Sequence, residues 1–269
     1  TSEVWDFDST DIMLEADPED EGFWEEGSNL VLNHDYEDLG SELLSQPVDL
    51  QTDFTAVNGA SFTDANTLVT TGGSIEGFTK SSFLTVGKTY KLIIAGTTTS
   101  SGFTLGNTTA SGNEYGSGFG THYFTASGNT AFWLRQGSAG TTNITSFSIK
   151  QVDPNDRWSL TGGTSISDGK MTVTGASGTS LGFQSMLVQG TAYELTYTIS
   201  NFSLSSGNTD VINNDGATIQ SISGNGTFTV IFTHSIANGN LIFRATGGTN
   251  SYQVDNVTVR EYAVQPKDI

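Results

Sequence analysis

The sequence predicts an all-β protein with two tandem antiparallel β-sandwiches, preceded by an acidic, mostly irregular N-terminal segment. Three observations lead to this prediction. The chain has 32 glycines and only 4 prolines, its apolar and polar residues alternate in short runs, and one pattern occurs twice. Alternation with a period of two is typical of half-buried strands, and the glycine, asparagine and serine residues between the runs predict turns.

The repeat is clearest in TVGKTYKLIIAGT (85–97) and VQGTAYELTYTIS (188–200), where a glycine turn leads into an alternating strand. Phe54 and Trp158 occupy the same place in the two copies, which predicts that both belong to the core. Further pairs follow at a constant offset of 104 residues: Phe62 with Ile166, Asp64 with Asp168, Val69 with Val173, and Thr70 with Thr174.

The repeat sets the predicted domain boundaries. They are an acidic attachment or oligomerisation segment at 1–39, a first sandwich at 40–152, a second at 157–262 and a C-terminal tail at 263–269. The joint QVDPNDRW (151–158) has turn chemistry and is too short to act as a long tether. We therefore expect the two sandwiches to hold a restricted relative orientation.

The net charge of −19 is concentrated at one end of the chain. Residues 1–42 contain 15 of the 29 Asp and Glu residues, and all 10 Lys and Arg residues follow them. The sequence has no cluster of Lys and Arg residues that would bind the phosphates of a nucleic acid, so nucleic acid is not an expected partner. The chain has no apolar run of about 18 residues, which predicts no membrane span. Its acidic start has no apolar core, so we expect no signal peptide.

Two interpretations fit the acidic segment. A solvated, disordered tail is consistent with its charge. A segment that docks on a partner or on a sister subunit explains its apolar side chains better, and the residues predicted to carry this attachment are Trp5, Phe7, Phe23 and Trp24.

The chain carries no catalytic constellation, so we predict that it is not an enzyme. The sequence has no cysteine, which excludes disulfides and thiolate metal sites. Its glycine-rich stretches do not join a buried parallel strand to a helix, and no nucleophile elbow is present. A hydrolase would need two carboxylates brought together by the fold, and most clustered acids lie in the N-terminal segment.

At DRWSLTGGTSISDGKMTVTGASGTSLGFQ (156–184) and YQVDNVTVREY (252–262) the second copy resembles carbohydrate-binding-module-like jelly rolls of the galactose-binding type. Such domains occur, singly or in tandem, in tailed-bacteriophage structural proteins and in bacterial surface proteins. The resemblance covers 157–262 well and 40–152 less well. It implies a non-catalytic fold that binds a glycan on a sheet face or at loop ends. Some members of that family hold a structural calcium with an acid at the start of the last strand among its ligands, and Asp255 occupies that position in this chain. One carboxylate alone does not make a calcium site. No other cofactor is expected.

Sugar recognition needs aromatic rings that stack on the sugar and polar groups that bond its hydroxyls. This search pattern selects six candidates, each with burial in the core as the alternative: Tyr115, Tyr123, Trp133, Arg135, Arg244 and Tyr252.

The resemblance, the expected lack of a signal peptide and the distinct N-terminal segment together predict a virion structural protein. It would be a head or tail fibre or decoration protein of a tailed phage, made in the host cytoplasm and displayed on the virion surface. The expected partners are other virion proteins of the capsid or tail, further copies of the chain in a homo-oligomer (a trimer is favoured), and a host-surface glycan. The alternative is a glycan-binding module pair of a bacterial surface or secreted protein, located outside the cell.

Overall fold

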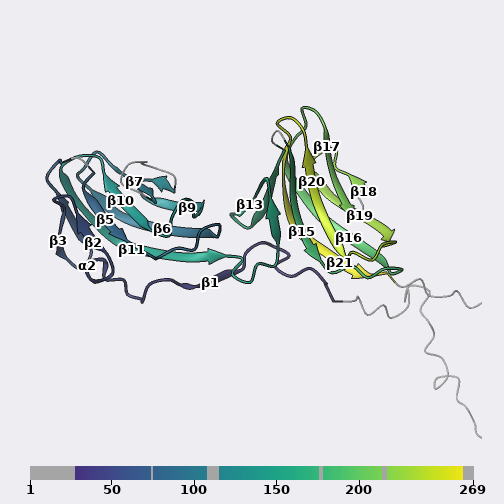
Figure 1. The fold of residues 1–269 in the computed structure, drawn as a ribbon, viewed down its shortest axis with the longest axis horizontal. Coiled ribbons are helices and arrows are strands. Elements are labelled where there is room, and N and C mark those ends of the chain that lie inside the picture. The colour runs from purple at the N-terminus through teal and green to yellow at the C-terminus, as the bar shows by residue number, and fades with distance from the viewer. Residues whose placement is uncertain (1–27, 74, 108–114, 176–177, 214–216, 263–269) are drawn as a thin grey trace, which may run out of the picture.

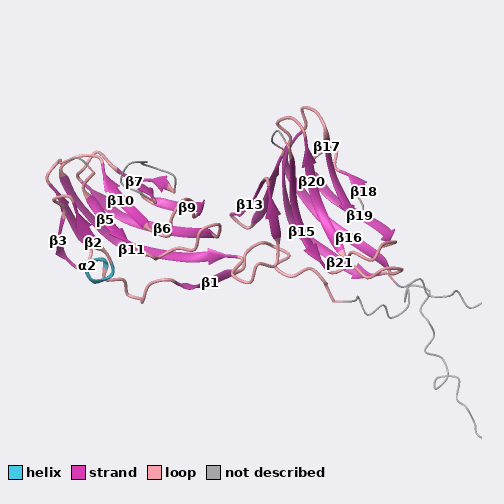
Figure 2. Ribbon diagram, viewed as in Figure 1, coloured by secondary structure: helices cyan, strands magenta, loops and turns pink. Residues whose placement is uncertain are grey.

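The computed structural model describes residues 28–73, 75–107, 115–175, 178–213 and 217–262. These residues form two antiparallel β-sandwiches (Figures 1 and 2), which confirms the predicted fold class. One short helix, α2 (Leu50–Asp53), lies among the described strands. No helix in this part of the chain is long and apolar enough to cross a membrane.

The first sandwich packs two sheets face to face. One has the order β3–β4–β11–β6–β9, with β1 also paired to β11, and the other has the order β2–β5–β10–β7–β8. The strands are β1 (Leu39–Glu42), β2 (Thr55–Val57), β3 (Ser61–Asp64), β4 (Thr67–Thr70), β5 (Gly77–Lys80), β6 (Thr89–Thr98), β7 (Phe103–Gly106), β8 (Gly116–Ser117), β9 (Gly120–Thr125), β10 (Phe132–Gln136) and β11 (Gly140–Val152).

The second sandwich repeats this topology, with sheet orders β13–β14–β21–β16–β19 and β12–β15–β20–β17–β18. Each strand from β2 to β11 of the first sandwich corresponds to the strand numbered ten higher in the second. The predicted tandem repeat is therefore confirmed. The strands are β12 (Ser159–Thr161), β13 (Gly163–Ser167), β14 (Lys170–Thr174), β15 (Thr179–Ser185), β16 (Ala192–Ser203), β17 (Asn208–Asn213), β18 (Thr218–Ser221), β19 (Gly226–Thr233), β20 (Asn240–Thr246) and β21 (Ser251–Glu261).

The segment that occurs twice in the sequence forms β6 in the first sandwich and β16 in the second. In both copies a tyrosine hydroxyl on this strand accepts a hydrogen bond from the turn before it. The backbone N–H of Thr85 donates to the Tyr90 hydroxyl at 2.8 Å, and that of Val188 donates to the Tyr193 hydroxyl at 2.8 Å. Both rings are buried in the core of their own sandwich. The contact fixes the turn before the strand in each copy.

Phe54 and Trp158 are both buried, which confirms that they are core residues. Phe54 lies just before β2, and Trp158 lies just before the equivalent strand β12. Phe54 packs in a cluster of phenylalanines, with its ring centroid 4.8 Å from that of Phe78. Trp158 packs 6.2 Å from Phe243 and 5.2 Å from Tyr36, centroid to centroid.

Residues 29–38, here called the strap, lie on the second sandwich although they precede the first in the chain. The backbone N–H of Leu30 donates to the Val259 carbonyl at 2.9 Å, and that of Val257 donates to the His34 carbonyl at 3.0 Å. The strap thus pairs with β21 beyond the point where β14 stops pairing with it. It buries the Val31 and Tyr36 side chains in the second core. Part of the predicted attachment segment 1–39 therefore has a structural role within this chain.

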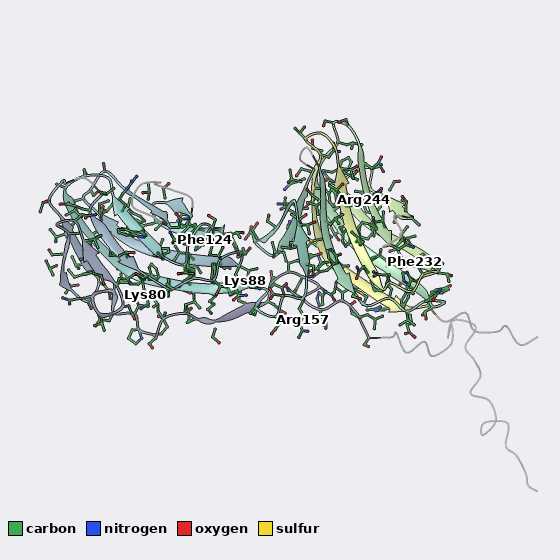
Figure 3. All side chains as sticks on the ribbon, viewed as in Figure 1. Lys80, Lys88, Phe124, Arg157, Phe232 and Arg244 are labelled. Atoms are coloured by element: carbon green, nitrogen blue, oxygen red, sulfur yellow. The ribbon has the colours of Figure 1, made fainter. Side chains whose placement is uncertain are left out.

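The strap then continues directly into β1, which pairs with β11 in the equivalent place on the first sandwich. One stretch of chain therefore runs along both sandwiches (Figure 1). Asp153, in the joint, accepts hydrogen bonds from the Asn33 side chain at 3.1 Å and from the backbone of Trp158 at 3.0 Å. An ion pair between Lys88 and Asp156 adds a contact where Lys88 faces the joint (Figure 3). These contacts support the expected restricted orientation.

Candidate functional site

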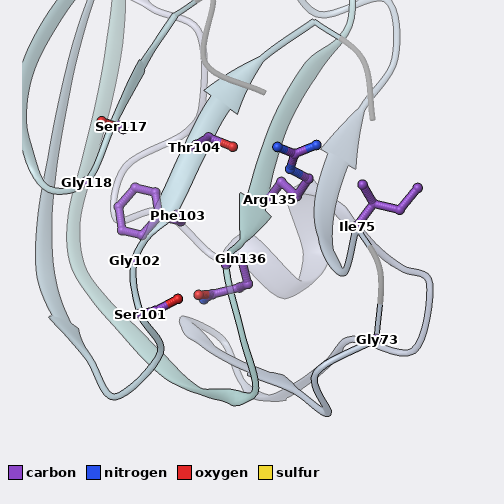
Figure 4. Close-up of a pocket in the computed structure, with 11 residues that line it drawn as sticks. Gly73, Ile75, Ser101, Gly102, Phe103, Thr104, Ser117, Gly118, Arg135 and Gln136 are labelled. Carbon is purple, nitrogen blue, oxygen red and sulfur yellow. The ribbon is translucent and has the colours of Figure 1, made fainter. Parts of the chain in front are cut away.

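A surface hollow of about 620 Å³ lies on the first sandwich, at the end of the sheet where β5 and β7 begin and β10 ends. Arg135 and Thr104 face this hollow, and Ile75 and Gly73 form its far wall (Figure 4). Its volume is in the range of sites that bind small molecules.

Strand β10 directs its side chains alternately to the core and to the surface. Phe132 and Leu134 are fully buried in the core, while Trp133 and Arg135 are partly exposed. Because residues two apart on a strand share a face, the indole and the guanidinium lie side by side on the outer surface, separated by roughly 6.6 Å along the strand. The structure thus brings together two of the sequence-predicted candidates.

Small residues flank both of these side chains. Trp133 lies between Thr79 on β5 and Gly106 on β7. The residues paired with Trp133 on the two adjacent strands are therefore small, and its side chain is partly exposed.

Arg135 has a similar setting, between Gly77 on β5 and Thr104 on β7. A Cβ at Gly77 would lie 1.9 Å from the Leu134 carbonyl oxygen, so only glycine lets β5 approach β10 this closely. The small residues beside Arg135 leave room for the hollow.

Two polar oxygens at the hollow are buried and have no hydrogen-bond partner among the described residues. They are the Thr104 Oγ1 and the Gln136 Oε1. Gln136 is 5% exposed, and its amide nitrogen is already used, because it donates to the Thr142 hydroxyl. An unpartnered buried acceptor costs about 1–3 kcal/mol. Because neither oxygen is exposed to solvent, a ligand in the hollow does not contact them without a local rearrangement.

Glu76 shapes the wall of the hollow. Its carboxylate accepts hydrogen bonds from the Thr71 backbone at 2.6 Å, from the Thr71 hydroxyl at 2.5 Å and from the Gly72 backbone at 2.9 Å. Its own carbonyl accepts from the Gln136 backbone at 2.8 Å. The hydrogen bonds from Thr71, and then from Gly72, lower the pKa of Glu76 below the ordinary value of 4.5.

This lowered pKa predicts a pH dependence of stability. A depressed pKa stabilises the fold fully above the ordinary pKa of 4.5, and the contribution is lost as the pH falls through the lowered value. We expect the thermal unfolding midpoint of the first sandwich to fall on acidification less steeply in Glu76→Gln than in the unmodified chain. Thermal melts between about pH 7 and pH 3 measure this. Glu37→Gln, at an exposed glutamate, is the control, and identical pH profiles for Glu76→Gln and the unmodified chain would contradict the assignment.

Two of the predicted glycan contacts are core residues. Tyr115 is 1% exposed and stacks on Phe124 with ring centroids 4.1 Å apart. Tyr252 is fully buried, and its hydroxyl donates to the Arg244 carbonyl at 3.0 Å. Neither ring offers a face to a ligand, so for these two the core alternative is correct.

Tyr123 and Arg244 also lie away from the hollow. Tyr123, on the outer face of β9, has the Lys91 ammonium 5.5 Å from its ring centroid and packs against the core of the second sandwich at the joint. Arg244 lies on β20 and forms an ion pair with Asp210, with 2.6 Å between Nη2 and Oδ2. Both are surface residues, but in different places from Trp133.

The Asp255 carboxylate accepts a hydrogen bond from the Asn256 backbone at 2.7 Å. Calcium takes six to eight oxygen ligands. Within the described ranges no group of three or more His, Cys, Asp or Glu side chains is placed to hold a metal ion. The carboxylates present do not make up a calcium site, and calcium at Asp255 stays a prediction from the resemblance alone. The attachment candidates Trp5, Phe7, Phe23 and Trp24 lie outside the described residues.

Sequence reasoning missed Glu76, Thr104 and Gln136. Thr104 and Gln136 lie next to recognisable strand residues, but threonine and glutamine are common in this chain and carry no signal of their own. Glu76 is an acid in a sandwich rather than in the N-terminal segment. The sequence SIEGF (74–78) does not indicate that the preceding loop donates hydrogen bonds to the Glu76 carboxylate.

No family model matches the sequence, and no curated protein matches it. Among solved structures, the chain is similar to the N-terminal CBM22-1-CBM22-2 tandem domain of Xyn10C from Paenibacillus barcinonensis. The match has 12% sequence identity and a TM-score of 0.33, and it covers 84% of this chain and 99% of that one. At this score the likeness supports no inference about function, which has to come from the geometry of the site.

Proposed function

We propose that the chain is a non-catalytic glycan-binding protein and that the hollow on the first sandwich, with Trp133 beside it, is its sugar site. One observation carries the proposal: an indole and a guanidinium share an outer sheet face and are flanked by Thr79, Gly106, Gly77 and Thr104. The flat ring suits the apolar face of a pyranose, and the arginine suits its hydroxyls.

The test is a glycan array with the full chain, followed by titration calorimetry with the best ligand. Trp133→Ala is expected to weaken binding at least tenfold. A sugar that covers roughly 80 Å² of the indole contributes about 2 kcal/mol at 25 cal/mol per Å², and 1.4 kcal/mol corresponds to tenfold.

Ile231→Ala is the matched control, because it removes a 50% exposed apolar side chain from an outer strand of the other sandwich. It is expected to leave the affinity unchanged. The proposal fails if no glycan binds, or if Trp133→Ala binds as tightly as the unmodified chain.

Attachment to a tailed-phage virion is a second proposal, and the acidic stretch with its four aromatic residues at 1–27 is what favours it. A chain that begins at Ser28 keeps the strap, so it separates attachment from folding. The virion hypothesis expects this chain to be left out of particles and to lose the oligomer, with a trimer favoured. Light scattering and particle composition measure both. A Ser28 chain that still enters particles as an oligomer would show that residues 1–27 do not carry the attachment. A full chain that enters no particles favours the alternative, a glycan-binding module pair of a bacterial surface or secreted protein.

A further inference from the structure

The first sandwich contacts the second at the joint through two apolar residues on its outer face. Tyr123 on β9 packs against the core of the second sandwich, and Val152, at the end of β11, is 5% exposed and belongs to that core. Val152 also lines both hollows at the joint, which Trp158 and Asp168 of the second sandwich line as well. Tyr123 and Val152 thus form an apolar contact between the sandwiches.

The strand register identifies the counterpart of Tyr123 on the second sandwich. Tyr123 pairs with Lys91, and Ile231 pairs with Glu194. These two partners directly follow the tyrosines that the repeat shares, so Ile231 occupies the position of Tyr123. Ile231 is 50% exposed on the outer face of β19, whereas Tyr123 is partly buried at the joint.

Tyr262 is the counterpart of Val152 by the same reasoning. Each comes one residue after the β11 or β21 residue that pairs with the repeated tyrosine. The Tyr262 backbone N–H donates to the Ala192 carbonyl at 2.8 Å, which places it beside the start of β16. Tyr262 is 40% exposed. The second sandwich therefore exposes, in Ile231 and Tyr262, the same apolar pair that the first sandwich packs into the joint.

The surface that receives this pair at the joint also has an exposed counterpart. It consists of β13 and the turn that follows it. Ile166 on β13 is 2% exposed, while its counterpart Phe62 on β3 is partly exposed, as are Asp64 and Ala65 in the turn after β3. Strand β3 lies at one end of the molecule and β19 lies toward the other (Figure 1). The chain thus presents both halves of the joint contact a second time, at its two ends.

We infer that the face formed by Ile231 and Tyr262 binds the β3 end of a second copy of this chain, so that copies join head to tail. The occupant follows from the joint, where the equivalent pair already packs on the equivalent end of a sandwich. The contact joins two different faces, so it extends into a row of copies instead of closing as a symmetric dimer. It does not depend on the proposed glycan site, because Trp133 lies on the other sheet of the first sandwich.

This contact is weaker than the joint. The ion pair between Lys88 and Asp156 has no counterpart, because both equivalent positions are threonines. Lys91 lines a joint hollow together with an aspartate, and Glu194 replaces this lysine, so two acids approach each other between copies. Separate copies also lack the short tether of the joint, and association is therefore expected at about 0.1–1 mM chain.

Sedimentation of the full chain at increasing concentration tests the inference, and the average mass is expected to rise. Ile231→Asp is expected to weaken the association at least tenfold, because it places a carboxylate against an apolar surface. Leu204→Asp is the matched control and is expected to change nothing. Leu204 is 49% exposed on the same sandwich, but it follows the other end of β16. Glu194→Lys restores the charge found at the joint and is expected to strengthen the association at least threefold.

Mixing two variants tests the head-to-tail geometry. Ala65→Glu blocks the β3 end with a larger, charged side chain, and it is expected to weaken the association as Ile231→Asp does. An equimolar mixture of these two variants is expected to associate, because each variant keeps one intact face. Thermal melts establish that all variants are folded.

Three results would overturn the inference. The first is a mass that stays constant up to about 1 mM. The second is an oligomer that Ile231→Asp leaves unchanged, or weakens no more than Leu204→Asp does, because such an oligomer would come from another part of the chain, such as residues 1–27. The third is a mixture of Ile231→Asp and Ala65→Glu that associates no better than either variant alone. Titration with a soluble glycan reports on the proposed function separately.

Discussion

A chain that begins at Leu39 is expected to keep the first sandwich folded and to lose the second, while a chain that begins at Ser28 keeps both. Removing the strap takes Val31 and Tyr36 out of the second core and uncovers the Trp158 ring that packs against Tyr36. The loss is at least that of an aromatic-to-alanine change in a core, about 3–5 kcal/mol. Since domains are stable by only about 5–15 kcal/mol, this change brings the second sandwich close to unfolding.

Polar contacts add to the effect. The Gln184 side-chain amide makes two hydrogen bonds to the Leu32 backbone: it accepts from the Leu32 N–H at 2.8 Å and donates to the Leu32 carbonyl at 2.9 Å. The Asn29 carboxamide oxygen accepts from the Val259 backbone at 3.0 Å. Without the strap, these β21 and β15 groups return to water or stay unpaired.

Tryptophan fluorescence measures the result cleanly. The Ser28 chain retains one tryptophan in each sandwich, Trp133 in the first and Trp158 in the second, because Trp5 and Trp24 are removed. Urea unfolding of the Ser28 and Leu39 chains then separates the two transitions. A second sandwich that is equally stable in both chains would show that the strap only rests on its surface.

The strap also shows where sequence reasoning stops. The repeat, the strand rhythm and the core roles of Phe54 and Trp158 follow from local patterns, because alternation and glycine turns are encoded in neighbouring residues. The pairing of residues 29–38 with β21 joins positions more than two hundred residues apart, as between Asn29 and Val257. No local pattern predicts such a contact, and the acidic composition of residues 1–42 favoured a segment separate from the sandwiches.

The site was predictable in part. Trp133 and Arg135 alternate with buried residues in FWLRQ, so their shared face was visible in the sequence. The same rule would have placed Tyr252 in the core, because it alternates in step with the buried Val254. Tyr115 had no such signal, since it follows a glycine-rich stretch rather than an alternating run. The small residues paired with Trp133 and Arg135, which include Gly77, Thr104 and Gly106, become informative only when the strand register is known.

The repeat makes one further pair of variants informative. Phe54→Ala is expected to destabilise the first sandwich by about 3–5 kcal/mol, and Trp158→Ala the second by a similar or larger amount. Phe54 is 5% exposed and its ring lies 5.6 Å from that of Phe147 on the facing sheet, centroid to centroid. Its removal leaves a cavity between the two layers of the first sandwich.

Trp158→Ala is expected to lower the free energy of unfolding by more than the lost side-chain volume alone accounts for. The indole N–H donates to the Asn33 carbonyl at 3.1 Å, so the variant breaks a bond to the strap as well as the packing on Phe243. The strap should therefore loosen together with the second core, and the first sandwich should be unaffected. Hydrogen exchange measured by mass spectrometry resolves this, because peptides from 29–38 and from β21 are expected to lose protection together. If the strap keeps its protection in Trp158→Ala, its contacts with β21 and Gln184 hold it without the tryptophan, and Trp158 is a core residue of the second sandwich alone.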